Sequence, residues 1–342
     1  MTDAARERLF GYERAFDNPV SVAVTITLVV LLIVGPLGIW LLARSGRIDA
    51  QLRAELLRRY YSWLFICPVL LVPILLGAAW TIIGVGVLSL FCYREYARAT
   101  GLFRERLISF VVVLGIVMLT LAALDHWYRL FVALTPLTVG VIAAVAILAD
   151  KPKGYIQRVG LAALGFLLFG AALGHFGYLA NDPDYRPVMI LVLLAVEMND
   201  VFAFVVGKVI GRHQLAPNTS PNKTVEGAIG AVLLTTLLVV GVGLFLFPAA
   251  YRDSHGITAA QEVRYLIGLG VIIGIVGLLG DLMLSAVKRD LGIKDFGTLM
   301  PGHGGLLDRF DSLILVAPAV FHYVNYVAGI GLHEPVKVFS GA

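Results

Sequence analysis

The chain has 342 residues, of which 59% are apolar and 15% are charged, whereas soluble domains average about 45–50% apolar and about 25% charged residues. Too few polar residues remain to cover a soluble domain, so the composition excludes a soluble enzyme, a disordered chain and a secreted disulfide scaffold. The net charge of +4 is spread along the chain and does not indicate nucleic-acid binding. The sequence predicts an all-α, polytopic membrane protein.

Ten stretches of the chain are candidates for spanning a membrane, which takes about 20 apolar residues per helix. They cover residues 20–43, 62–78, 80–93, 107–124, 130–149, 159–180, 187–207, 225–248, 265–287 and 311–331. Only Ala79 and Trp80 separate the second stretch from the third, so whether these two are separate stays open. Cys67 and Cys92 both lie in apolar stretches, which predicts buried thiols rather than a disulfide or metal ligands.

The basic residues predict the orientation of these spans. One alternate set of connections comprises residues 44–61, 94–106, 150–158, 208–224 and 288–310. This set holds 19 of the 27 Lys and Arg residues, and the other set, with both termini, holds the remaining 8. Cytoplasmic loops carry the excess of basic residues. We therefore expect the first set in the cytoplasm, both termini outside, and the protein in the cell (inner) membrane.

The amino-terminal region, residues 1–190, contains about six spans and no recognisable chemical motif. Within it, apolar and basic residues alternate from Arg47 to Tyr61, which suits either a helix on the cytoplasmic headgroups or an ordinary positively charged connection. Polar residues gather instead in residues 191–342, which we interpret as a catalytic membrane region of about four spans.

The first polar group is Glu197-Met198-Asn199-Asp200, inside an otherwise apolar helix. An ionisable side chain within a span costs about 2.5–3.5 kcal/mol on insertion scales, so such a residue is a functional candidate. The alternative is a carboxylate that pairs with a basic residue of another helix for packing.

The second group is the loop Gly211–Thr224. Its prolines predict a stiff turn, and Asn222, Lys223 and Thr224 supply hydrogen-bond donors at the start of a helix, which is a favourable place for an anion. A capped helix start without a ligand is the alternative.

The third group runs from Gly280 to Ser312. Asp281, Ser285 and Lys288 share one helix face because they are three or four residues apart. Asp308 and Asp311 are one turn apart at the start of the last span. Carboxylates favour Mg²⁺, since hard cations prefer oxygen ligands.

A glycine-rich loop with Lys294, His303 and Arg309 lies between these acidic residues. Carboxylates beside a basic, glycine-rich loop suit metal-assisted phosphoryl or nucleotidyl transfer. A solvated charged loop is the alternative, but it does not explain Asp281 at the end of a span.

The stretch from Ser285 to Asp311 resembles the signature of the phosphatidate cytidylyltransferases, also called CDP-diacylglycerol synthases. Its pattern is Ser-x-apolar-Lys-Arg, four residues, Lys-Asp, and a Pro-x-His-Gly-Gly-apolar-x-Asp-Arg-apolar-Asp ending, and every polar position is present. Asn199-Asp200 and the segment Ser220–Gly227 match the family in order and spacing. The resemblance covers about residues 190 to 320.

The resemblance implies that CTP and phosphatidic acid react to give CDP-diacylglycerol and pyrophosphate with Mg²⁺, assisted by a second, monovalent cation. It also implies membrane lipids as partners and a homodimer. We assign Asp281 and Asp308 to the metal, with Asp311 and Asp200 as secondary ligands. The predicted phosphate-binding and catalytic cations are Lys223, Lys288, Arg289, Lys294 and Arg309. The predicted orienting residues are Asn199, Ser220, Asn222 and His303.

Two other functions stay open. A related transferase or kinase could act on another lipid phosphate or a polyprenol. An ion-coupled transporter could use Asp200 and Asp281 at the membrane midplane, although transporters usually show related halves and this sequence shows none. The sequence does not choose the acyl chains of the lipid.

Overall fold

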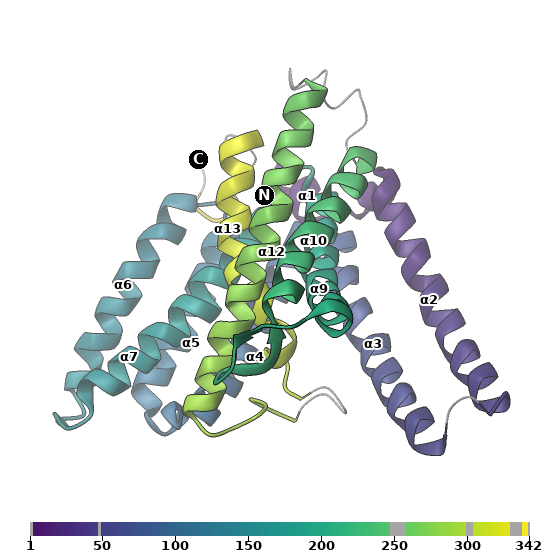
Figure 1. Ribbon diagram of the computed structural model, residues 1–342. Helices are drawn as coiled ribbons and strands as arrows, with labels where there is room; N and C mark the ends of the chain where they lie inside the picture. The colour runs from purple at the N-terminus through teal and green to yellow at the C-terminus, as the bar shows by residue number, and fades with distance from the viewer. Residues whose placement is uncertain (1–2, 47–48, 247–257, 299–303, 329–336, 341–342) are drawn as a thin grey trace.

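The computed structural model describes residues 3–46, 49–246, 258–298, 304–328 and 337–340, and it confirms an all-α architecture (Figure 1). The α-helices are α1 (Asp3–Phe10), α2 (Pro19–Arg44), α3 (Ala50–Leu76), α4 (Ala78–Ala99), α5 (Arg106–Leu124), α6 (Tyr128–Ile147), α7 (Tyr155–Gly165), α8 (Leu173–Leu179), α9 (Tyr185–Ile210), α10 (Val225–Leu246), α12 (Ala259–Asp290) and α13 (Asp311–Ala328). The shorter elements are η1 (Tyr12–Phe16), η2 (Leu102–Arg104), the π-helical turn η3 (Phe166–Ala172), η4 (Leu307–Arg309) and the strands β1 (Gln214–Ala216) and β2 (Ser220–Thr224).

All ten predicted spans fall in helices, but the count of ten membrane crossings is not confirmed. Within the described residues, seven helical segments are long and apolar enough to cross a membrane. These seven lie in α2, α5, α6, the continuous rod α7–η3–α8, α9, α10 and α12. The other three predicted spans correspond to α3, α4 and α13. In α3 the apolar part is only Leu64–Leu76, because charged residues occupy its first half.

The second and third predicted spans are separate helices. Gly77 ends α3 and adopts a φ of 137°, which only glycine takes readily. The Thr81 hydroxyl of α4 lies 3.0 Å from the carbonyl oxygens of both Pro73 and Gly77, so it satisfies backbone acceptors freed by the break. The segment up to Tyr61 is the first part of α3, continuous with the second predicted span rather than a separate surface helix.

The connections alternate between two ends of the molecule as predicted. The described residues of the predicted basic set lie at the lower end in Figure 1, among them the β1–β2 hairpin and the segment directly after α12. At the opposite end, the Asp125 carboxylate accepts hydrogen bonds from the backbone of Val338 and Ser340, and Arg8 donates to Leu124. Both ends of the chain are therefore anchored on the same side.

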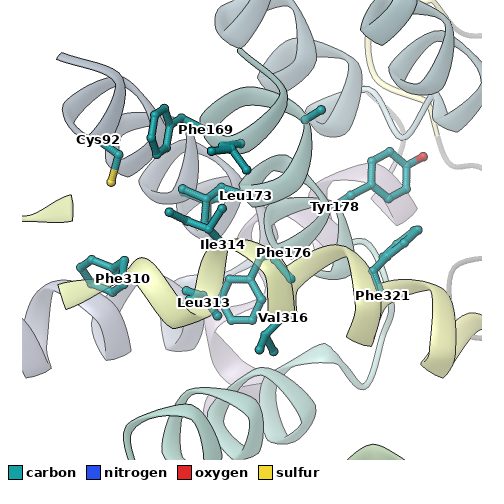
Figure 2. Close-up of a cluster of buried hydrophobic side chains, with 14 of the residues drawn as sticks. Cys92, Phe169, Leu173, Phe176, Tyr178, Phe310, Leu313, Ile314, Val316 and Phe321 are labelled. Atoms are coloured by element: carbon teal, nitrogen blue, oxygen red, sulfur yellow. The ribbon is translucent and has the colours of Figure 1, made fainter. Parts of the chain in front are cut away.

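Part of the buried core lies where η3 and α8 meet α4 and α13. Figure 2 shows Leu173 and Phe176 close to α13, near the fully buried Ile314, and Phe169 on the other side of Leu173, close to Cys92 of α4. Both cysteines are free thiols, as expected; Cys92 is buried in this core and Cys67 is half-buried.

Glycines on α12 allow its neighbours to approach closely. A Cβ atom at Gly270 would lie 2.5 Å from the Cα of Thr236 in α10, and one at Gly280 would lie 2.7 Å from the carbonyl oxygen of Asp311 in α13. Small residues at such positions let membrane helices pack backbone to backbone. This packing brings Asp281, the next residue on α12, beside the start of α13.

Candidate active site

A short β-hairpin, absent from the sequence-based expectation, delivers Lys223 to the helix bundle. Strands β1 and β2 pair antiparallel, with Gln214 opposite Thr224. The predicted helix start at Val225 is confirmed, but the segment before it is strand β2. Side chains alternate along a strand. Lys223 therefore faces away from the side that carries Ser220 and Asn222.

Two contacts tie this hairpin to the start of α10. The backbone N–H of Gly227 donates to the Thr224 hydroxyl at 3.1 Å, which caps the helix. The Glu226 carboxylate accepts from the backbone N–H groups of Arg212 and His213 at 3.0 and 3.2 Å, and it contacts the His213 ring at 2.6 Å. These contacts hold the two ends of the loop that carries Lys223 together at the start of α10.

Lys223 forms an ion pair with Asp281 at the lower end of α12. The Ser285 hydroxyl, one turn further along α12, donates to the other oxygen of Asp281 at 3.1 Å. This ion pair brings the second and third polar groups of the sequence into contact.

Two further carboxylates approach Asp281 from neighbouring helices. Asp200 of α9 and Asp311 of α13 both interact electrostatically with Asp281. The Ser312 hydroxyl lies 3.4 Å from Asp200. We call Asp200, Asp281 and Asp311 the Asp281 cluster. Arg309 adds a positive charge that acts on both Asp200 and Glu197.

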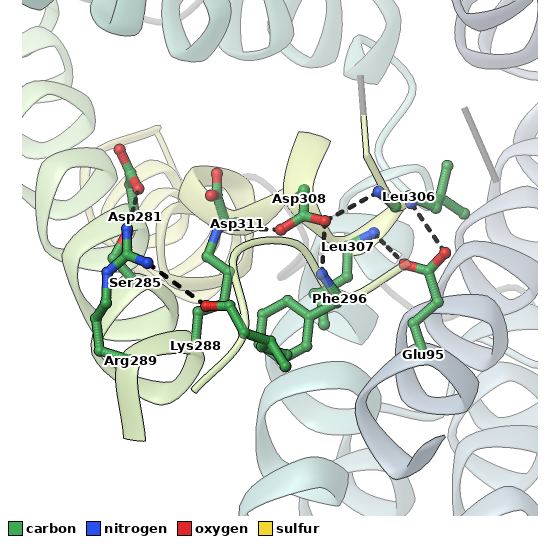
Figure 3. A network of polar contacts seen from close by, with 12 residues as sticks. Glu95, Asp281, Ser285, Lys288, Arg289, Phe296, Leu306, Leu307, Asp308 and Asp311 are labelled. Carbon is green, nitrogen blue, oxygen red and sulfur yellow. Dashed lines mark hydrogen bonds and ion pairs between the residues drawn. The ribbon is translucent and has the colours of Figure 1, made fainter. Parts of the chain in front are cut away.

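Asp308 lies near Asp311 but has other partners, mainly backbone N–H groups (Figure 3). One of its oxygens accepts from the backbone N–H groups of Phe296 and Gly305, both at 2.9 Å. The other accepts from the Lys288 ammonium at 3.0 Å. The Asp308 side chain is buried, so this carboxylate organises the glycine-rich loop around itself.

Glu95 of α4 adds a second buried carboxylate to this hydrogen-bond network, and the sequence analysis did not predict this role for Glu95. Its carboxylate, only 7% exposed, accepts from the backbone N–H groups of Leu306 at 3.1 Å and Leu307 at 2.8 Å (Figure 3). We call Glu95 and Asp308 the Asp308 cluster. The only sequence signal was an acidic residue near the end of a predicted span, between Arg94 and Arg98. The contact also joins the two predicted regions, 1–190 and 191–342.

The predicted metal ligands supply suitable donor atoms but are not assembled as a complete site. Within the residues that the structure describes, no three His, Cys, Asp or Glu side chains are grouped as metal ligands. Instead, the Lys223 ammonium contacts one oxygen of Asp281, and the Lys288 ammonium contacts one oxygen of Asp308. Around Asp281, the neighbouring groups are the Ser285 hydroxyl and the carboxylates of Asp200 and Asp311, whose oxygens suit a hard divalent cation.

Other predicted site residues have diverse surroundings. Asn199 is buried between helices: its amide accepts from the Thr235 hydroxyl at 3.0 Å and donates to Gly274, so its contact with substrate stays a prediction. Arg289 donates to the carbonyl oxygens of Thr219 and Ile293. Lys294, Asn222 and Arg309 are exposed at the same end of the molecule, and Ser220 is half-buried. His303 lies outside the described residues.

Comparison with known proteins identifies the family of the chain. The model of the cytidylyltransferase family matches residues 57–327. A protein of Escherichia coli K12 described as uncharacterized, YnbB, is 30% identical over 82% of this chain and 91% of its own length. Phosphatidate cytidylyltransferases of Staphylococcus epidermidis and Synechocystis are 33% and 43% identical over 48% and 42% of this chain. These alignments span about half of those two relatives, 55% and 45% of their lengths. The chain belongs to the cytidylyltransferase family.

Proposed function

We propose that this protein is a phosphatidate cytidylyltransferase, which transfers CMP from CTP to phosphatidic acid and releases pyrophosphate. One observation carries the proposal: Lys223 meets the Asp281 cluster at the loop-bearing end of a helix bundle with several membrane-spanning helices. Acidic residues beside lysines can bind phosphates through metal ions and ammonium groups. The relatives matched over about half their length are phosphatidate cytidylyltransferases, which supports a lipid phosphate as acceptor.

The reaction needs positioning and charge neutralisation rather than a protein nucleophile. An oxygen of the lipid phosphate attacks the α-phosphorus of CTP and forms the new P–O bond. The bond from that phosphorus to the β-bridging oxygen breaks, and pyrophosphate leaves with its electron pair. Lys223, Lys288 and Arg309 neutralise phosphate oxygens, and the loop held by Asp308 sets their positions.

Mg²⁺ would be held by Asp281 with Asp200 and Asp311. Each of the lysine contacts on Asp281 and Asp308 marks a carboxylate oxygen that already attracts a cation. On substrate binding, the ammonium groups would move to phosphate oxygens and free these carboxylates. The metal would neutralise the triphosphate, and a second, monovalent cation would assist it.

The direct test is an assay of the purified protein with labelled CTP and phosphatidic acid, with ATP and dolichol as controls. We expect label in CDP-diacylglycerol and an equal amount of pyrophosphate, dependent on Mg²⁺. Transfer from ATP, or transfer to dolichol in place of phosphatidic acid, would contradict the proposal and favour a lipid kinase or another transferase.

We also propose that the site faces the cytoplasm of the cell membrane, where CTP is made. The uneven distribution of Lys and Arg supports this orientation. Thr298→Cys and Ser340→Cys, each in a background without Cys67 and Cys92, should react with an impermeant thiol reagent from opposite sides. Reaction of both from one side would refute the topology.

A further inference from the structure

An apolar cavity lies beside the candidate active site and is chemically unlike that site. It has a volume of about 670 Å³ and is enclosed by α3, α4, α8, α9 and the start of α13. This volume lies within the range of about 300–1,000 Å³ that is typical of ligand pockets. Except for Arg58, Tyr61 and Thr81, its lining residues are apolar or glycine.

The few polar groups lie towards the two ends of the cavity. Arg58 and Tyr61 are on the first half of α3, at the same end as the active-site loops. Thr81 is near the start of α4, and its hydroxyl already donates to the α3 backbone. The stretch of α4 from Thr81 to Phe91 is therefore an apolar wall about 15 Å long.

The cavity opens sideways, towards the membrane. Phe65 and Val69 of α3 and Val87 of α4 line it and are 65%, 53% and 45% exposed. Because these positions lie along the apolar length of the bundle, their surroundings are hydrocarbon rather than water. A hollow that opens there admits lipid chains, which are the apolar molecules present at that depth.

The inner wall of the cavity joins the active site. Leu306 and Phe310 line it, and they flank Asp308 in the glycine-rich loop. Figure 2 shows Phe310 at the start of α13, on the same stretch of helix as Leu313. Met189 and Leu193 of α9 also line it. Residue 197, one turn beyond Leu193, begins the acidic segment of α9.

We infer that this cavity binds one acyl chain of the lipid phosphate, with the chain along α4 and the phosphate end between Arg58 and the glycine-rich loop. This inference rests on the proposed function, because that function supplies a lipid as substrate. Arg58, at the end of the cavity nearest the active site, suits the phosphate of such a lipid, and the apolar interior suits its acyl chain. The cavity is thus the element that selects chain length.

The first experiment tests binding without turnover. A phosphatidic acid with a photoreactive diazirine near the end of one acyl chain is incorporated into nanodiscs with the full-length protein, and the labelled peptides are mapped. We expect label on α3 and α4 around Val69 and Val87, reduced by unlabelled phosphatidic acid. Label spread evenly over the lipid-facing sides of α2, α5 and α6, without competition, would overturn the inference.

The second experiment fills the cavity. Val87→Trp narrows it, and Ile83→Trp is the matched control: Ile83 is also β-branched, lies one turn away on α4, is 42% exposed and does not line the cavity. We expect Val87→Trp to abolish competed labelling and to lower kcat/KM for long-chain phosphatidic acid by about ten-fold, equivalent to roughly two methylenes kept out of the cavity. A dihexanoyl lipid and Ile83→Trp should show no change.

These two experiments separate the inference from the proposed function. If the protein does not use CTP, the labelling result still stands by itself, because it needs no reaction. Equal losses with long and short chains, or unchanged labelling in Val87→Trp, would contradict the inference. The alternative to a lipid chain is a second copy of the protein that covers the opening of the cavity. In that case Phe65→Cys, in a background without Cys67 and Cys92, would form a disulfide between subunits, and this result would also contradict the inference.

Discussion

The two acidic clusters at the lower end of the bundle use their carboxylates differently. In the Asp281 cluster, Asp281 and Asp200 contact side chains, from Lys223, Ser285 and Ser312. The Asp308 cluster, in contrast, accepts four backbone N–H groups from the segment Phe296–Leu307. Side-chain partners can move when a ligand arrives, whereas backbone partners fix the course of a loop. The first cluster is therefore suited to binding and the second to positioning.

The largest expected effects come from removing one charge in each cluster. Asp281→Asn and Asp308→Asn should each reduce turnover by about 10³-fold while the protein still enters the membrane. Hydrogen exchange distinguishes their causes. Asp308→Asn should expose the amides of Phe296 and Gly305, since it weakens their acceptor and leaves Lys288 without its counter-charge. Asp281→Asn should leave those amides protected. Near-normal turnover in either variant at ordinary Mg²⁺ concentration would remove that residue from the account.

Two basic residues, Lys223 and Arg289, are expected to act on different substrates. Lys223 is paired with the Asp281 cluster. Arg289 lies instead in the last turn of α12, at the loop-bearing end of the bundle, where we expect a lipid phosphate to arrive. Lys223→Ala should mainly weaken the use of CTP and Arg289→Ala the use of phosphatidic acid. Each loss of a charge-assisted contact costs about 1.5–3 kcal/mol, or roughly 10- to 150-fold in the affected kcat/KM. Kinetics with each substrate varied in turn measure this, and equal losses in both variants would show one merged phosphate site.

Glu95 gives a smaller effect that isolates positioning. Glu95→Gln keeps the size of the side chain but replaces one acceptor oxygen by an amide donor, which opposes the N–H of Leu306 or Leu307. We expect about a ten-fold fall in kcat, in line with one lost charge-assisted hydrogen bond, and faster exchange of those two amides. Glu105→Gln, at the same end of the bundle, is the control. A fall in kcat without faster exchange would contradict a positioning role.

Changes at the opposite end of the molecule, where Asp125 holds residues 338–340, should have little effect on catalysis. Burial raises the pKa of Asp125, but hydrogen bonds from Phe339, Ser340 and Val338 outweigh burial and leave the pKa below its ordinary value. The ionised form is thus the one that holds the tail, so the contact is complete above about pH 4 and weakens as the pH falls through the lowered pKa. Asp125→Asn should free the tail amides to exchange at pH 7 and change activity by less than about two-fold. A larger loss of activity would show that the two ends are coupled.

The sequence predicted much of this arrangement, for identifiable reasons. Apolar length indicated the long helices, apart from the charged first half of α3, and the spacing of Asp281, Ser285 and Lys288 placed them on one face. It did not predict the β-hairpin, because Pro221 and a five-residue strand give no alternating apolar pattern. It also missed Glu95, because a carboxylate that binds backbone N–H groups more than 200 residues away leaves no local pattern in the sequence.

The division between the two clusters is tested most directly by metal binding. Mn²⁺ titration followed by electron paramagnetic resonance, with CTP present, would compare the unaltered protein with Asp281→Asn and Glu95→Gln. The account predicts that Asp281→Asn weakens Mn²⁺ binding by at least about ten-fold, and that Glu95→Gln binds Mn²⁺ as the unaltered protein does. Unchanged binding in Asp281→Asn, or an equal loss in both variants, would contradict it.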